Sequence, residues 1–173
     1  MKIGILTVSD RASRGEYTDT SGPAIASFLE SAVATPWEQI SRVVPDGAES
    51  VAKAMLDFCD RDRVALLLVT GGTGPAERDQ TPEAMARIID KELPGFGELM
   101  RRISFRTVPT AILSRQGAGI RGATLIVTLP GKPAAIDVCL GAIFPAVPYC
   151  LELIGAGLLE TNPAIVQTFR PGG

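Results

Sequence analysis

One stretch of this sequence constrains the fold more than any other, because an apolar run passes through glycines into a helix-start signal. Residues 64–70 are almost continuously apolar, which is typical of a central parallel strand that is covered on both faces. Gly71-Gly72-Thr73-Gly74 follows at once, and glycines allow a close backbone approach in which amide groups point at an anion. Thr81-Pro82-Glu83 supplies a capping residue, a proline at the first helical position and an early acid. The stretch therefore predicts a buried strand, a tight loop and a helix N-terminus in series.

The glycine loop alone does not decide between two interpretations. It is not a Walker loop, since no Gly-Lys-Ser/Thr follows at the required spacing. It also matches a dinucleotide-binding GxGxxG poorly, because Glu77 stands where the third glycine belongs. Phosphate binding by the loop amides and a tight turn with a purely structural role both remain open.

Strand-like and helix-like patterns alternate along the rest of the chain. Further strands are predicted at residues 3–8, 37–44 and 124–129. Helices are predicted to begin at Thr20 or Ser21, at the capping-box sequence 46–49, at Thr81, at Ala134 and after Pro148. Since no repeat or linker breaks this alternation, residues 1–173 are predicted to form one three-layer α/β domain around a mainly parallel sheet.

Several segments between these elements have less regular patterns. Residues 93–97 are predicted to interrupt the helical pattern, and a helix is predicted after them at residues 98–105. Residues 111–115 fit either a strand or a loop. Three glycines predict a flexible segment at residues 117–122. The tail at residues 155–173 is rich in Gly and Pro and is predicted to lie as a strap on the surface.

The composition excludes several classes of function. With a formal net charge of −2 and no run of Lys or Arg, the chain has no electrostatic footprint for nucleic acid. Histidine is absent, which removes Ser-His-Asp, Cys-His and His-zinc chemistry. Cysteines without a CxxC pair are typical of reduced thiols in a cytoplasmic protein. The longest apolar region, residues 134–153, contains charged residues and prolines and is not predicted to cross a membrane.

Four predicted strands end in polar or glycine-containing loops. In parallel sheets ligands bind beyond the carboxyl ends of the strands, and all four loops would share that rim. The loops are Ser9-Asp10-Arg11, Pro45-Asp46, Gly71 to Asp79, and Pro130-Gly131-Lys132. This rim is therefore the predicted functional site.

Asp46 and Asp79 are the candidate carboxylates of the rim. Mg²⁺ prefers a few carboxylates together with phosphate oxygens, so both side chains are candidates to hold that ion. In the alternative interpretation Asp46 is the N-cap of the next helix. Asp79 would then stabilise a helix dipole or pair with Arg78.

Basic side chains, and hydroxyl side chains at the same rim, are candidates to contact phosphates. They are Arg11, Arg78, Arg115, Lys132, Ser9, Thr73 and Ser114. Solvated surface charge and local backbone capping are the alternative interpretations. A site with carboxylates, amides and arginine but no histidine suits phosphoryl or nucleotidyl transfer, because an ionised phosphate nucleophile needs no general base.

The longest of these motifs resembles the MoaB/Mog family of molybdenum cofactor biosynthesis proteins. Residues 70–84 match the family's glycine loop followed by Arg-Asp-x-Thr-Pro-Glu-Ala. Further segments match in the same order, namely residues 8–11, 44–46, 94–98, 114–115 and 129–133. Within the family, residues 109–116 and 147–150 are similar to the bacterial molybdopterin adenylyltransferase branch.

This resemblance implies a Rossmann-like fold and an adenylyltransferase activity. ATP and molybdopterin would be the substrates, Mg²⁺ the cofactor, and adenylyl-molybdopterin and pyrophosphate the products. It also implies a homotrimer and hand-over of the product to a molybdenum-insertion protein. The two aspartates that matter in this branch fall on Asp46 and Asp79. The residues implied to line the pterin and nucleotide pocket are Ser9, Asp10, Gly71, Gly72, Thr73, Gly74, Arg78, Ser114, Arg115, Pro130, Gly131 and Lys132.

Two other functions remain open from the sequence. A member of this family could bind molybdopterin without adenylylating it, or act as an oligomeric scaffold. A nicotinamide-dependent oxidoreductase on a Rossmann-like sheet would need a third glycine and an acid after the next strand, which this sequence supplies poorly. Pyrophosphate release that depends on molybdopterin separates the enzyme from the binding module.

Overall fold

A six-stranded sheet runs through the computed structural model, which describes residues 1–171. The strands are β1 (Lys2–Val8), β2 (Glu38–Val44), β3 (Leu66–Thr70), β4 (Lys91–Glu92), β5 (Ala118–Arg121) and β6 (Thr124–Leu129). Their order across the sheet is β2-β1-β3-β6-β5-β4. The first four in this order are parallel, whereas β5 and β4 pair antiparallel at one edge. The predicted mainly parallel sheet is confirmed.

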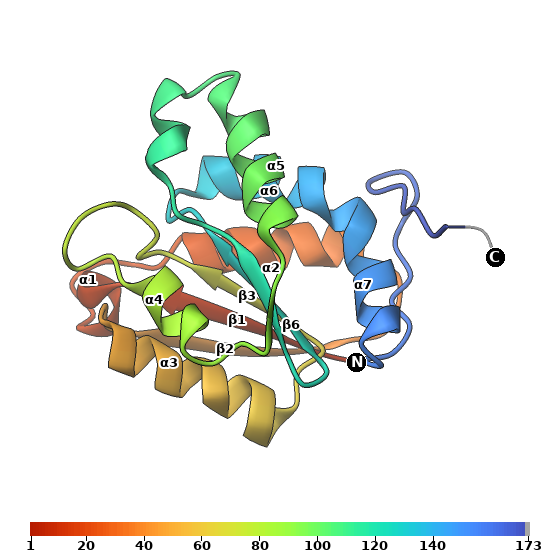
Figure 1. Cartoon of the computed structure of the whole chain (residues 1–173), viewed down its shortest axis with the longest axis horizontal. Coiled ribbons are helices and arrows are strands. Elements are labelled where there is room, and N and C mark those ends of the chain that lie inside the picture. Colours follow the sequence, from red (N-terminus) through yellow and green to blue (C-terminus); the bar gives the residue numbers. More distant parts are fainter. Residues whose placement is uncertain (172–173) are drawn as a thin grey trace.

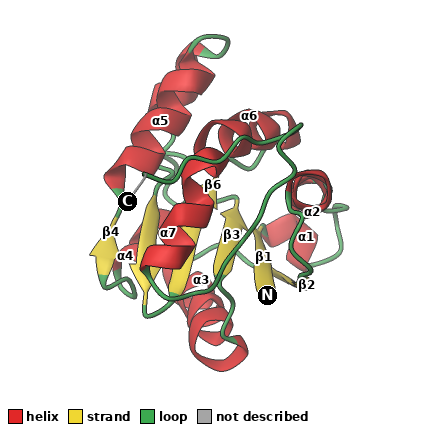
Figure 2. Ribbon diagram, turned by 90° about the vertical axis from the view of Figure 1, so that its right-hand side faces the viewer, coloured by secondary structure: helices red, strands yellow, loops and turns green. Residues whose placement is uncertain are grey.

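Helices cover both faces of the sheet, which gives the predicted three layers (Figure 1, Figure 2). One layer contains α2 (Ser21–Ala32), α5 (Pro94–Phe105), α6 (Pro133–Ile143) and α7 (Val147–Leu153). The other contains α3 (Ala48–Leu56) and α4 (Thr81–Ala86). Shorter pieces are α1 (Asp10–Ser13), the π-helical turn η1 (Asp57–Asp62), and the 3-10 turns η2 (Pro109–Leu113) and η3 (Phe144–Ala146).

Strand β3 shows why the central run is apolar from Leu66 to Val69. All of its residues are buried, and successive side chains point to opposite faces of the sheet. Leu66 and Leu68 belong to the hydrophobic cluster under α2 and α6. Leu67 and Val69 belong to the cluster under α3 and α4. Each fully buried side chain of this kind is worth about 1.5–3 kcal/mol. The one polar residue of the strand, Thr70, is buried with its hydroxyl bonded to the Pro130 carbonyl.

Helix α5 begins earlier than the sequence pattern predicts. The predicted interruption at residues 93–97 is wrong, because Pro94 occupies the first turn of the helix, where a missing N–H leaves no bond unmade. Gly97 lies inside this helix, and a Cβ there would lie 2.4 Å from the carbonyl oxygen of Gln116. Gly97 therefore allows α5 to pack closely on the neighbouring segment and does not break the helix.

Two segments between α5 and β6 also differ from the prediction. Residues 111–115, which fit either a strand or a loop, lie partly in the 3-10 turn η2. The predicted flexible segment at residues 117–122 contains β5, so that prediction is wrong. A Cβ at Gly119 would lie 2.8 Å from the side chain of Ile89, so this glycine marks close packing. Gly122, with a φ of +52°, makes the turn into β6.

A carboxylate that the sequence pattern did not indicate caps helix α2. Thr20 stands at the N-cap, but its side chain makes no capping bond. Oδ1 of Asp19 accepts the N–H groups of Ser21 (2.9 Å) and Gly22 (3.1 Å), and its Oδ2 accepts the Thr7 hydroxyl at 2.7 Å. The prediction of Thr20 or Ser21 as the capping side chain is wrong. Asp19 instead ties the start of α2 to β1.

The apolar segment Pro133–Leu153 belongs to the core of the protein. By length and composition alone it could cross a membrane, with a mean hydropathy of 1.8 over its most apolar window. The structure divides it into α6, η3 and α7, and Ile136, Leu140 and Phe144 are fully buried in the cluster under α2. Its apolar composition is explained by this packing.

The C-terminal tail lies as a strap on the surface, as predicted, over the part that the structure describes. Thr161 forms an isolated bridge with Val33, next to the end of α2. Leu159, a residue of the strap, is fully buried against the core. Gly172 and Gly173 lie outside the described residues.

Candidate active site

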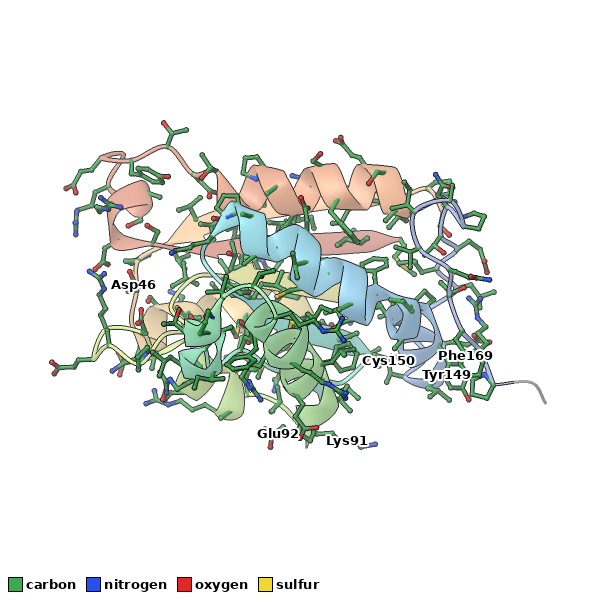
Figure 3. The ribbon with its side chains drawn as sticks, turned by 90° about the horizontal axis from the view of Figure 1, so that it is seen from above. Asp46, Lys91, Glu92, Tyr149, Cys150 and Phe169 are labelled. Carbon is green, nitrogen blue, oxygen red and sulfur yellow. The ribbon has the colours of Figure 1, made fainter. Side chains whose placement is uncertain are left out.

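The carboxyl ends of the four parallel strands meet at one edge of the sheet, which Asp46 marks in Figure 3. The loop after β1 is joined to β2, because the Ser9 N–H donates to the Val44 carbonyl at 2.9 Å. The end of β3 is joined to the loop after β6, because the Thr70 hydroxyl donates to the Pro130 carbonyl at 2.8 Å. The predicted rim is therefore present, and it carries all four predicted loops.

Asp10 and Asp46 bind each other's backbone. The Asp10 N–H donates to Asp46 Oδ2 at 2.9 Å, and the Asp46 N–H donates to Asp10 Oδ1 at 3.1 Å. These reciprocal bonds fix the Asp46 carboxylate between the loops after β1 and β2. The alternative interpretation of Asp46 as the N-cap of α3 is wrong. Gly47 stands at that position, and the Ala48 N–H donates to Gln80 Oε1.

The first two glycines of the loop leave no room for a side chain. Gly71 has a φ of +99°, and a Cβ there would lie 2.2 Å from the Val8 carbonyl oxygen. Gly72 has a φ of +62°, and a Cβ there would lie 2.4 Å from the Thr81 hydroxyl oxygen. The left-handed backbone and the close approach both require glycine at these positions.

The carbonyl groups of the glycine loop are bonded within the protein. Thr81 binds the first two, since its hydroxyl donates to the Gly71 carbonyl at 2.8 Å and its N–H to the Gly72 carbonyl at 3.0 Å. Arg115 binds the next two. Its N–H donates to the Thr73 carbonyl at 2.8 Å, and its Nε donates to the Gly74 carbonyl at 3.0 Å. The loop is therefore held through its carbonyl groups.

Three consecutive amide groups of the same loop have no acceptor in the described part of the protein. Within residues 1–171, the N–H groups of Gly72, Thr73 and Gly74 donate to neither a carbonyl nor a side chain. Consecutive N–H donors on a fixed backbone are suited to binding an anion. This geometry favours anion binding over a turn with a purely structural role.

Asp79 closes the glycine loop. Its Oδ2 accepts the N–H of Ala76 at 3.2 Å, and a Cβ at Gly74 would lie 2.5 Å from this oxygen. Among the ion pairs within residues 1–171, none joins Asp79 to Arg78. The alternative interpretation of Asp79 as the ion-pair partner of its neighbour therefore finds no support in the structure.

The two candidate carboxylates line one cavity of about 170 Å³, where the loops after β1, β2 and β3 meet. Its lining residues are Val8, Ser9, Asp10, Arg11, Asp46, Gly72, Arg78 and Asp79. The fold thus brings both carboxylates together with two of the predicted basic side chains. A small, charged cavity beside unpartnered amides is suited to phosphate groups and their counterion.

A larger, apolar cavity of about 550 Å³ lies on the other side of the glycine loop. Several predicted site residues line it, namely Thr73, Gly74, Ser114, Pro130, Gly131 and Lys132. Most of its remaining lining comes from α5, η2 and α6. Its volume lies in the range of small-molecule sites and is sufficient for a fused heterocycle.

Tyr17 and Gln116 also line cavities at the rim, although the sequence pattern does not indicate them. Tyr17 lines a third cavity of about 190 Å³ on the same rim, and the guanidinium of Arg11 lies 5.1 Å from its ring centre. Gln116 lines the apolar cavity and is buried, and its Oε1 accepts the Ser114 hydroxyl at 2.6 Å. Neither Tyr17 nor Gln116 follows a predicted strand directly, so the pattern of strand ends could not indicate them.

Arg115, a predicted phosphate contact, is placed elsewhere in the structure. Its guanidinium donates to the carbonyl groups of Gly74 and Asp79 and pairs with the Glu83 carboxylate. It lines none of the three cavities described above. Arg115 therefore contacts the glycine loop itself.

The carboxylates of the small cavity fit a Mg²⁺ ion that also binds phosphate. Oδ1 of Asp46 and Oδ1 of Asp79 accept no hydrogen bond from residues 1–171, whereas the Oδ2 atoms are bonded to backbone. Residues 1–171 contain no group of three or more His, Cys, Asp or Glu side chains that could hold a metal ion. An ion held here would therefore complete its shell with phosphate oxygens and water, as Mg²⁺ commonly does.

Known proteins match this chain over nearly its whole length. A family model described as a probable molybdopterin binding domain matches residues 4–149. The molybdopterin adenylyltransferase of Helicobacter pylori (strain ATCC 700392 / 26695) is 50% identical, over 98% of this chain and 96% of that protein. The molybdopterin adenylyltransferase of Escherichia coli (strain K12) is 44% identical, over 99% of this chain and 94% of that protein.

Solved structures share the fold. The molybdopterin biosynthesis enzyme MoaB of Thermus thermophilus has a TM-score of 0.83 and 42% identity, over 92% of this chain and 99% of that chain. A structure of MogA has a TM-score of 0.82 and 36% identity, over 89% of this chain and 99% of that chain. Because the family model and relatives of similar length agree with the glycine loop and its rim, the chain belongs to the MoaB/Mog family of molybdenum cofactor biosynthesis proteins.

Proposed function

We propose that the protein is a molybdopterin adenylyltransferase, which transfers AMP from ATP to the terminal phosphate of molybdopterin. One observation carries this proposal, namely the unpartnered N–H groups of Gly72, Thr73 and Gly74 between a carboxylate-lined cavity and an apolar one. The amides suit a phosphate chain, and the apolar cavity suits a heterocycle. The names of the relatives support the choice of ATP and molybdopterin as substrates.

The proposed reaction needs little proton chemistry from the protein. An oxygen of the terminal phosphate of molybdopterin forms a bond to the α-phosphorus of ATP. The bond from that phosphorus to the bridging oxygen breaks, and pyrophosphate leaves. The attacking phosphate is already ionised at neutral pH, which is consistent with the absence of histidine from the chain.

The glycine-loop amides and the basic side chains would stabilise charge in this reaction. Charge that develops on phosphoryl oxygens is stabilised most by donors that are already in place, and the loop is held in place through its carbonyl groups. Arg11 and Arg78 line the small cavity and would neutralise phosphates there. Ser114 and Lys132 line the apolar cavity, where they would contact the heterocyclic substrate.

Asp46 and Asp79 would hold Mg²⁺ in the small cavity. When bound, this ion neutralises charge on the phosphate oxygens of the nucleotide and of the leaving group. The bond from the Asp10 N–H fixes the Asp46 carboxylate, and the bond from the Ala76 N–H fixes the Asp79 carboxylate. The two side chains are therefore oriented before substrate arrives, which favours rapid transfer.

The substitution Asp79→Asn tests this assignment, because it keeps the size of the side chain and removes its charge. We expect at least about a 100-fold loss of adenylyl transfer, with the fold and molybdopterin binding retained. The assay measures adenylyl-molybdopterin and pyrophosphate together. Asp137→Asn, an exposed change on α6 outside the three cavities, is the matched control and should keep wild-type rates. A wild-type rate for Asp79→Asn would contradict the assignment.

A second candidate function is molybdopterin binding without catalysis. The description of the family model names binding only, and the apolar cavity does not depend on either aspartate. This candidate predicts that molybdopterin binds but that ATP is not cleaved.

We further propose that the protein works as a homotrimer in the cytoplasm and passes its product to a molybdenum-insertion protein. Exposed apolar side chains on α5, on η2 and between them, including Phe105, Val108 and Ile112, give a surface that another copy could cover. In Figures 1 and 2 these elements project from the body of the molecule. The free cysteines support a reducing compartment, and burial raises the pKa of the Cys59 thiol to about 11.

A further inference from the structure

Arg115 spans the second part of the loop after β3, from Thr73 to Asp79. Its backbone N–H donates to the Thr73 carbonyl at 2.8 Å, and its Nε donates to the Gly74 carbonyl at 3.0 Å. Its Nη2 donates to the Asp79 carbonyl, and its Nη1 pairs with the Glu83 carboxylate. One residue therefore holds both the middle of the loop, at Thr73 and Gly74, and the candidate catalytic aspartate at its end.

The part of the loop between these bonds has no other outside support. Residues 75–78 are exposed. The remaining hydrogen bonds of residues 75–79 join Ala76 and Asp79 to each other, at 2.9 Å and 3.2 Å. Within residues 1–171, Arg115 is therefore the only residue outside this segment that hydrogen-bonds to it.

We propose, on the basis of the adenylyl transfer proposed above, that Arg115 is a positioning residue that holds Asp79 for the reaction and does not bind phosphate. A guanidinium carries five N–H donors in a rigid fork, and Arg115 directs its three nitrogens at Gly74, Asp79 and Glu83. The cavity that it lines lies between α4 and α5, away from the carboxylate-lined cavity.

Glu83 holds the guanidinium in turn. It lies on α4, directly after the loop, so the pair joins the loop to the following helix. The hydrogen bond from Arg115 lowers the pKa of Glu83, so the carboxylate stays ionised to a lower pH than an ordinary glutamate. Both side chains are more than a third exposed, at 38% and 46%, so the pair adds little to stability. Its loss should appear in the rate of reaction and in loop mobility, with the free energy of unfolding almost unchanged.

Two measurements on Arg115→Ala and Arg115→Lys test the proposal. Hydrogen–deuterium exchange of residues 74–80 without substrate reports the loop alone, and it should be faster in both variants because lysine lacks the fork. Steady-state adenylyl transfer should show kcat reduced by about 100-fold, as for other misplaced catalytic groups. The KM for ATP should change by less than about threefold, because no contact with ATP is lost.

Arg170→Ala is the matched control. Arg170 also binds a backbone carbonyl, that of Leu159 at 3.2 Å, and a carboxylate, that of Glu152 at 3.0 Å. It lies on the tail strap and lines none of the cavities described, so exchange of residues 74–80 and kcat should stay at wild-type values. Glu83→Gln leaves Arg115 intact and is expected to loosen the loop less. If Arg115→Ala does not fold, the exchange and kcat of Glu83→Gln test the proposal in its place.

Three outcomes are distinguishable. Faster loop exchange with reduced kcat supports the proposal. A raised KM for ATP with unchanged kcat and unchanged exchange would overturn it and assign Arg115 to phosphate binding. The third outcome combines faster loop exchange in the Arg115 variants with a wild-type protein that does not adenylylate molybdopterin. It would support the role of Arg115 in holding Asp79 and would overturn the proposed function instead.

Discussion

At the residue scale, the site depends on a glycine loop whose carbonyl groups are bonded within the protein and whose N–H groups are available to a ligand. The carbonyl groups of the glycine loop are bonded to Thr81 and Arg115, while the N–H groups of Gly72, Thr73 and Gly74 have no partner within residues 1–171. An anion that binds these amides does not have to reorganise the loop. This arrangement is what electrostatic stabilisation of a transferred phosphoryl group requires.

The steric demand at Gly71 gives a prediction about stability. We expect Gly71→Ala to lower the free energy of unfolding by about 2–4 kcal/mol, because it combines a left-handed backbone with a collision against the Val8 carbonyl. Gly15→Ala is the matched control, since Gly15 has a φ of +72° but no atom within 4 Å of an added Cβ. Its loss should be about 1 kcal/mol, from backbone strain alone. Equal losses in urea denaturation would contradict this account.

The sequence was sufficient to place Asp46, Asp79 and the glycines on one rim, because each lies in the loop after a predicted parallel strand. It was not sufficient for Arg115, whose partners are backbone carbonyl groups on the loop after β3. Carbonyl groups are present at every residue and leave no pattern in a sequence. The same holds for Gln80, which caps α3 from a different loop.

At the element scale, the antiparallel edge of the sheet is tied to the helical layer by a bidentate ion pair. Arg121 on β5 binds both carboxylate oxygens of Asp60 in η1, at 2.9 Å and 2.8 Å, and also donates to the Ile88 carbonyl at 2.8 Å. The hydrogen bond from Arg121 lowers the pKa of Asp60. Asp60 therefore joins η1 to strand β5 at the edge of the sheet.

The Asp60–Arg121 pair predicts a pH-dependent contribution to stability. Because the folded pKa of Asp60 is lowered, the contribution is present above the ordinary carboxylate pKa and is lost as the pH falls through the folded value. Asp60 is 55% exposed, so after solvent screening we expect Asp60→Asn to lose only about 0.5 kcal/mol at pH 7. The difference from wild type should shrink as the pH falls below the ordinary carboxylate pKa of 3.8.

Asp57→Asn is the control for this measurement, since Asp57 approaches Arg61 only to 3.8 Å and should contribute almost nothing at either pH. A difference between Asp60→Asn and wild type that is as large at pH 3 as at pH 7 would contradict the ion-pair explanation.

Elements with continuous apolar runs were predictable, whereas some elements marked by proline or glycine were not. Strands β1, β3 and β6 are buried on both faces, so their continuous apolar pattern indicates a central strand. Pro94 and Gly119 were read as breaks, but one starts a helix and the other allows contact with Ile89. Which role such a residue takes depends on a neighbour that is distant in sequence.

At the scale of the whole molecule, the site occupies one end of the sheet and the tail strap lies elsewhere. Figure 3 shows Asp46 at one end of the molecule and Tyr149, Cys150 and Phe169 at the other. The apolar arm formed by α5 and η2 projects beside the apolar cavity, which these elements also line. Copies that cover this arm would therefore lie close to the site.

The proposed homotrimer gives a prediction about mass. Light scattering coupled to size exclusion should give about three times the chain mass of 18.2 kDa at micromolar concentration. Phe105→Ser and Ile112→Ser together should reduce this mass, because both side chains are exposed in a single copy and would be covered in an assembly. A wild-type mass of one chain would contradict the trimer.

Release of pyrophosphate from ATP tests the central proposal most directly. The purified protein is incubated with ATP and Mg²⁺, with and without molybdopterin, and pyrophosphate and adenylyl-molybdopterin are both quantified. Adenylyl transfer predicts that pyrophosphate appears only when molybdopterin is present and in an amount equal to that of adenylyl-molybdopterin. Binding of molybdopterin without any release of pyrophosphate would contradict the account and leave the protein as a binding module.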